Sequence, residues 1–142
     1  MFGQWPGNDA MAKARFGETV TNGQGNGIIS DNEADQFWIH LAKAEHISQA
    51  TPPSSKLGGQ FSIIGDADLR KNFLVLSQSD GGGALTPKQA ATLKAKAGEN
   101  DPSTGQILIT EGVGSNAGSC IRDGTYNLGT STSTCILRVA LQ

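Results

Sequence analysis

Residues 22–47 constrain the fold of this chain more than any other part of the sequence. They begin as a polar loop with glycine at three alternating positions and pass directly into a segment with helical periodicity. Five apolar residues recur there at spacings that place them on or near one helix face: Phe37, Trp38, Leu41, Ala44 and Ile47. Ser30 followed by Glu33 forms a capping-box sequence. We therefore predict that the loop ends near residue 30 and that an amphipathic helix follows it.

The remaining chain predicts a second helix and several short strands. Thr86 as N-cap, Pro87 at the first helical position and Gly98 as stop define the helix. Its buried stripe is predicted to hold Leu85, Ala90 and Leu93, and its water-facing side Lys88, Lys94 and Lys96. Strands are predicted at residues 60–65, 72–77, 106–110, 125–128 and 135–141, and a single helical turn at residues 10–15. These elements indicate one α+β domain over residues 1–142, with a small antiparallel sheet and two helices.

Composition limits the classes of function. The 142 residues include 19 glycines, with 17% charged residues and a formal net charge of −2. This balance argues against a nucleic-acid binder, which usually carries a clustered basic surface. No apolar run approaches the ~18–20 residues that cross a bilayer, so no membrane span is expected in this chain.

Cys120 and Cys135 are the only cysteines, and neither forms a CxxC pair nor has a histidine nearby. We predict a C-terminal disulfide between them, and two free buried thiols are the alternative. A disulfide closing such a loop would stabilise the fold by roughly 3 kcal/mol in the chain-entropy model. It would also imply an oxidising compartment.

Catalytic signatures are missing from the sequence. It contains no nucleophile elbow, P-loop or dinucleotide fingerprint, and its acidic residues are scattered. His40 and His46 are six positions apart on the predicted helix, so they cannot share a metal as i, i+4 histidines do. We expect both to be exposed or partly covered. No catalytic residue and no organic cofactor is predicted.

One metal hypothesis remains. Five residues fall at the ligating positions of an EF-hand calcium loop: Asn22, Gln24, Asn26, Ile28 (through its carbonyl) and Glu33. Gly27 lies where that loop makes its sharp turn. The first three ligands would be neutral amides, so calcium affinity would be weak. The alternative is a structural turn whose polar side chains bond their own backbone.

Aromatic residues are concentrated before the main helix, at Phe2, Trp5 and Phe16. They could cap the core of the domain. Alternatively, together with Trp38, they could complete a surface for a partner helix.

Five stretches in chain order carry a resemblance to a known family. They are residues 6–8 (PGN), 22–28 (NGQGNGI), 37–47 (FWIHLAKAEHI), 100–105 (NDPSTG) and 120–137, where the cysteines flank GTYNL. Together they resemble the globular head domain of type IV pilins and pseudopilins. Gln24 stands where many members have Asp.

The resemblance implies a non-enzymatic subunit of an extracellular filament that reaches the cell surface through the periplasm. Its partners would be other pilin subunits. Cys120 and Cys135 would bound the exposed loop that pilins use for contacts. A minor pilin or adhesin-like module at a filament tip is the alternative, and an unrelated secreted disulfide-stapled protein is a third.

The family's long apolar N-terminal helix has no counterpart in residues 1–142. Two explanations are open: a head domain from which the helix was removed, or the globular half of a split pilin whose helix is a separate short subunit. Both predict an apolar groove on the sheet that a hydrophobic helix would fill.

Overall fold

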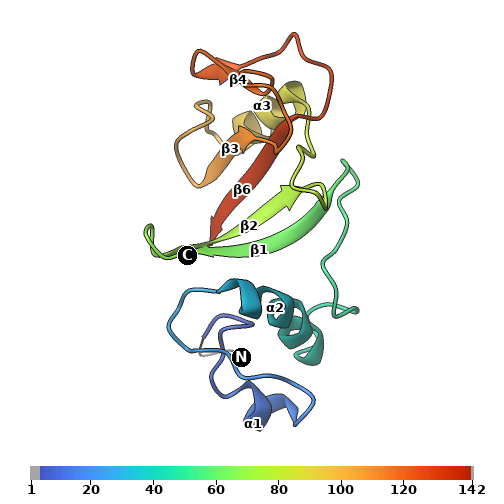
Figure 1. The fold of residues 1–142 in the computed structure, drawn as a ribbon, viewed down its shortest axis with the longest axis vertical. Helices are drawn as coiled ribbons and strands as arrows, with labels where there is room; N and C mark the ends of the chain where they lie inside the picture. The colour runs from blue at the N-terminus through green and yellow to red at the C-terminus, as the bar shows by residue number, and fades with distance from the viewer. Residues whose placement is uncertain (1–3, 142) are drawn as a thin grey trace. The chain divides into compact units, whose positions relative to one another are not determined.

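The computed structural model describes residues 4–141 and has an α+β architecture (Figure 1). These residues divide into two compact units. The first contains the chain up to Pro52, residues 63–73 and Leu141, and the second contains residues 53–62 and 74–140.

The first unit carries two helices, α1 (Ala12–Phe16) and α2 (Asp31–Lys43). The start of α2 is confirmed, since Ser30 is its N-cap and donates its backbone N–H to the Glu33 carboxylate at 2.8 Å. Its end is earlier than predicted. Glu45 adopts a left-handed φ of 60°, which is incompatible with helix, so Ile47 lies outside it.

Four strands form the main sheet in the order β1-β2-β6-β3. Their bounds are Gln60–Asp66 for β1, Lys71–Ser77 for β2, Ile107–Glu111 for β3 and Cys135–Leu141 for β6. β3 pairs antiparallel with β6, with Ile109 opposite Leu137. The four predicted strands that form this sheet are each confirmed to within one residue at each end.

The second unit packs helix α3 (Pro87–Lys96) and a disulfide against this sheet. The capping box of Thr86 and Gln89 is present, and Gly98 ends the turn after the helix with a φ of +78°. Seven residues form the buried cluster: Leu76, Ala84, Leu85, Ala90, Ile109, Cys120 and Cys135. The disulfide thus shares one buried cluster with aliphatic residues from β2, β3, α3 and the segment before α3.

A second, two-stranded sheet lies between the cysteines. It pairs β4 (Ile121–Arg122) with β5 (Thr125–Tyr126), and the predicted strand at 125–128 is shorter than expected. The predicted α+β class, antiparallel sheet and disulfide are confirmed, with three helices in place of two because the turn at 10–15 becomes α1. Within residues 4–141, no helix combines the length and apolarity needed to span a bilayer.

Candidate functional site

The glycine-rich loop encloses the side chain of Asn8, which is fully buried. Its amide nitrogen Nδ2 lies 3.0 Å from each of three oxygens: Asn26 Oδ1, the Ile28 carbonyl and Glu33 Oε1. Its Oδ1 accepts the backbone N–H of Gly27 at 2.8 Å. A single side chain therefore links residues 26–28 of the loop to Glu33 at the start of α2.

Glu33 is the negative charge of this cluster and is only 5% exposed. Its carboxylate also accepts N–H groups from Gln24 at 2.6 Å and Ser30 at 2.8 Å, and the Ser30 hydroxyl at 2.8 Å. Burial raises the pKa of Glu33, but the hydrogen bonds from Gln24, Ser30 and Asn8 outweigh it and hold the pKa below its usual value. Glu33 is therefore held as an anion that organises the surrounding donors.

Close backbone approach explains two of the glycines. A Cβ at Gly7 would lie 2.5 Å from the Glu33 carbonyl oxygen, and the φ of Gly7 is +81°. A Cβ at Gly23 would lie 2.3 Å from the Gly7 carbonyl oxygen. The PGN segment, the loop and α2 can stack this closely only because both positions lack side chains.

Asn72 of β2 anchors the far side of the loop. Its Oδ1 accepts the Ile29 N–H at 2.8 Å, and its Nδ2 donates to the Gly27 carbonyl at 2.9 Å. The loop is thus fixed by side-chain amides from two distant parts of the chain.

Three of the five residues predicted as calcium ligands converge and two do not. Asn26, Ile28 and Glu33 direct oxygens to one point, which Asn8 Nδ2 occupies. Asn22 Oδ1 instead accepts the Lys13 N–H at 2.7 Å, and the Gln24 side chain contacts Ser30 and Asn26. Within residues 4–141, no group of three or more His, Cys, Asp or Glu side chains is placed to hold a metal ion. The donor set here is thus one carboxylate with neutral oxygens.

His40 is not exposed, contrary to the sequence expectation, whereas His46 is exposed. The Gly7 N–H donates to His40 Nδ1 at 2.8 Å, and Nε2 lies 3.0 Å from the Thr21 carbonyl oxygen. These partners define the neutral tautomer with its proton on Nε2. His40 thus joins the PGN segment and the loop entry to α2.

The aromatic residues expected to face a partner helix have different surroundings. Trp38 is only 5% exposed and packs edge-on against Phe37, so it lies in the core of the first unit. Trp5 and Phe16 are half-buried, and the Phe16 ring lies 6.1 Å from that of His40. Phe2 lies outside the described residues.

In the second unit, Cys120 and Cys135 form the disulfide, which resolves the two interpretations of the cysteines. The Glu111 carboxylate accepts the N–H groups of Cys120 and Ile121 at 3.0 Å. Leu85 exchanges two backbone hydrogen bonds with Cys135, at 2.9 and 3.1 Å. The base of the cysteine loop is therefore held by the disulfide, by hydrogen bonds to a carboxylate and by main-chain hydrogen bonds.

Lys94 is fully buried, which corrects its predicted place on the water-facing side of the helix. Its ammonium donates to the carbonyls of Thr104 and Ile107 and lies 3.0 Å from a Glu99 carboxylate oxygen. The sequence pattern treats every lysine as solvated, whereas this one closes the turn between α3 and β3.

Tyr126 in β5 is half-buried, and its hydroxyl has no hydrogen-bond partner among residues 4–141. Burial, followed by the negative charges of Asp101 and Glu99, raises the pKa of Tyr126 to about 12. The hydroxyl is therefore held neutral and is no general base.

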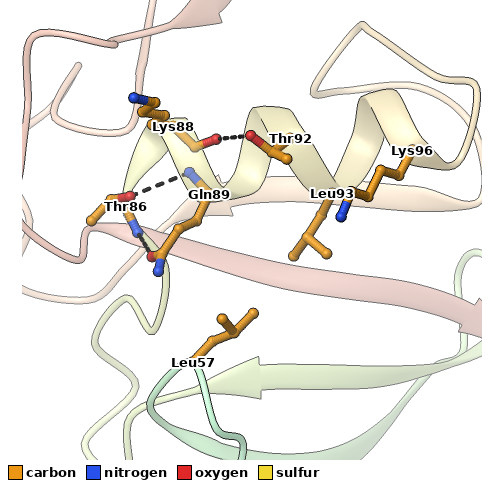
Figure 2. A pocket seen from close by; sticks show the side chains of 7 residues that line it. All are labelled: Leu57, Thr86, Lys88, Gln89, Thr92, Leu93 and Lys96. Atoms are coloured by element: carbon orange, nitrogen blue, oxygen red, sulfur yellow. Dashed lines mark hydrogen bonds between the residues drawn. The ribbon is translucent and has the colours of Figure 1, made fainter.

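An open cleft of about 440 Å³ runs along α3 (Figure 2). Leu57 and Leu93 extend into it from the loop and the helix, and the Thr86–Gln89 capping box closes one end. The two lysines of its lining, Lys88 and Lys96, are exposed. With no carboxylate, histidine or cysteine in its lining, the cleft holds no nucleophile or general base of those types.

The sequence predictions assign no structural role to the residues that hold these sites together. Asn8, His40, Lys94 and Glu111 find their partners far along the chain or outside any periodic pattern. The only feature of the sequence that could have indicated these residues is the position of a polar side chain beside a tight turn or on an apolar helix face.

No protein-family model, no curated protein and no solved structure matches this chain.

Proposed function

We propose that this protein is a non-enzymatic structural subunit of a type IV pilus-like or pseudopilus-like filament. The supporting observation is the disulfide between Cys120 and Cys135, which attaches an exposed two-stranded loop to the last strand of a small antiparallel sheet. This is the feature that the resemblance of residues 6–137 to pilin head domains predicts. The loop then serves as a contact surface on the outside of the filament.

Exposed apolar side chains near the cysteine loop suit such a contact. Val113 is 72% exposed and Leu128 is 64% exposed. Isolated exposed apolar residues are common on monomers, so these two support the proposal only together with the loop.

The sheet offers apolar surface for a hydrophobic helix. On β3, Leu108 is half-buried and lies opposite Arg138 of β6, on the other face of the sheet from Ile109 and Leu137. A pilin helix, continuous with the head or supplied as a separate short subunit, would bury the apolar part of the sheet face that it covers and gain roughly 25 cal/mol per Å² of apolar surface.

Isolation of native material tests the proposal. Surface filaments are sheared from the source cells, imaged by electron microscopy and analysed by intact mass spectrometry. We expect this chain in the filaments, either fused to a hydrophobic helix or together with a short helical partner in equal amount. Recovery of the chain only as a free secreted monomer, with no filament, would contradict the proposal.

A binding module at a filament tip is the second candidate, favoured by the exposure of Val113 and Leu128. Labelling with an antibody against the cysteine loop separates the two. A major subunit gives label along the whole fibre, whereas a tip protein gives label at one end only.

A further inference from the structure

We infer that the amide of Asn8 takes the place of a divalent cation in the glycine-rich loop, so that the loop closes without metal. This inference is independent of the proposed filament function.

The first argument is the arrangement of oxygens. A main-chain carbonyl, a side-chain amide oxygen and a carboxylate oxygen all lie 3.0 Å from Asn8 Nδ2. They come from the third, fourth and last of the five ligating positions that the calcium-loop pattern predicts. An amide nitrogen has two protons, so three oxygens exceed its donors and one proton is shared. Such crowding of oxygens, one of them anionic, is typical of a cation cage.

The second argument is the orientation of the amide. The Gly27 N–H donates to Asn8 Oδ1 at 2.8 Å, so exchanging the amide oxygen and nitrogen would place two donors face to face. The exchange would also bring Asn8 Oδ1 to within 3.0 Å of three oxygens. The nitrogen is therefore the atom that faces the cage.

The third argument is the count of charges. Among residues 4–141, Glu33 is the only carboxylate that accepts a hydrogen bond from the Asn8 side chain, while the two earlier loop amides, Asn22 and Gln24, are engaged elsewhere. Calcium affinity rises with the charge of the ligands, so a single carboxylate holds the ion poorly. The neutral Asn8 amide nitrogen, which donates two protons, fits this set of oxygens better than a calcium ion does.

The inference predicts that one isosteric substitution converts the loop into a calcium site. Asn8→Asp would direct a carboxylate oxygen at the three cage oxygens, where only a cation relieves the repulsion. We expect the wild-type melting temperature to be the same in EDTA and in millimolar calcium. We expect N8D to melt lower than wild type in EDTA and to regain roughly 5–15 °C in calcium.

Asn22→Asp is the matched control, because it adds the same charge to the same loop at a side chain that faces Lys13 rather than the cage. N22D should show no response to calcium. Adding Glu33→Gln to N8D should abolish the calcium response, since it removes the second carboxylate.

Two results would overturn the inference. A rise in the wild-type melting temperature with calcium would mean that the loop itself binds the ion. An N8D protein that melts at the same temperature with and without calcium, or that stays unfolded in both, would mean that the oxygens form no cation cage. The calcium titration of the wild-type protein tests whether the loop itself binds the ion, and it does so whether or not N8D folds.

Discussion

At the scale of single residues, burial rather than residue type determines the role of each side chain. Lys94 and His40 are types that usually lie on surfaces, yet both are fully buried and supplied with partners. Trp38 follows the usual rule, since its ring fills the core beside Phe37. The sequence predicts apolar positions well because their spacing repeats, but it carries no signal for a polar residue whose partners lie elsewhere in the chain.

Trp38 supplies the first prediction. Replacing Trp38 with Ala should lower the free energy of unfolding by about 3–5 kcal/mol, because it leaves a cavity in the first unit. Urea denaturation followed by circular dichroism measures this change. Trp5→Ala is the control, since Trp5 is only half-buried and should cost clearly less. Equal effects of the two substitutions would show that Trp38 is no core anchor.

Tyr126, the only tyrosine, supplies the second. Its folded pKa of about 12 lies above the value of about 10 in an unfolded chain, so folding favours the protonated form. Its contribution to stability is fully present below about pH 10 and is lost as the pH rises towards about 12. Ultraviolet absorbance of the phenolate should therefore remain absent until that range. A transition near the ordinary value in the folded protein would contradict this environment.

At the scale of elements, local sequence signals are sufficient to predict where helices begin. The sequence shows no comparable signal for the pairing of strands that are far apart in the chain. Ser30 and Thr86 mark the two helix starts correctly, because a capping residue acts within one turn of its own position. The strand order β1-β2-β6-β3 could not be derived, since it depends on pairings between distant segments. The early end of α2 was also missed, because nothing in the residue type of Glu45 requires its left-handed conformation.

The turn between α3 and β3 gives the third prediction. Lys94→Met should cost about 2–4 kcal/mol, because the Thr104 and Ile107 carbonyls lose their donor and Glu99 loses its ion partner. Lys96→Met, at an exposed position of the same helix, should stay within about 0.5 kcal/mol of wild type. Thermal and urea unfolding of the pair measures the difference, and equal stabilities would show that the buried ammonium contributes nothing net.

The disulfide gives the fourth. Reduction, or Cys135→Ala, should lower the free energy of unfolding by about 2–5 kcal/mol, because the unfolded chain regains the freedom of the cysteine loop. Melting curves with and without reductant test this. A double variant with Ala at Cys120 and Cys135 should not respond to reductant at all. If the melting temperature of the wild-type protein also stays the same in reductant, the disulfide does not contribute to its stability.

At the scale of the whole molecule, the proposed filament function rests on five weak motifs in series and on the arrangement of the cysteine loop. The sequence predicted the α+β class and the disulfide, and both are confirmed. It could not predict the Asn8 cluster, since the four hydrogen bonds of the Asn8 side chain join segments up to 25 positions apart with no shared periodicity.

The fifth prediction concerns the apolar surface of the isolated chain. A hydrophobic dye should fluoresce in its presence, because Leu108 of β3, on the face of the sheet opposite to Ile109, is only half-covered. A synthetic apolar helical peptide should displace the dye, whereas a peptide of scrambled sequence and equal composition should displace less. No dye binding by the folded chain would argue against a helix-docking surface.

The bridge between Cys120 and Cys135 also has a mechanical consequence. If a fibre made of such subunits is pulled, tension that enters β6 from outside the loop passes through the sulfur bridge and bypasses residues 121–134. The Cα atoms of the two cysteines stay 5.2 Å apart, whereas the same stretch of reduced chain could extend to about 50 Å. Under load the ends of the loop therefore keep their separation while the rest of the subunit stretches.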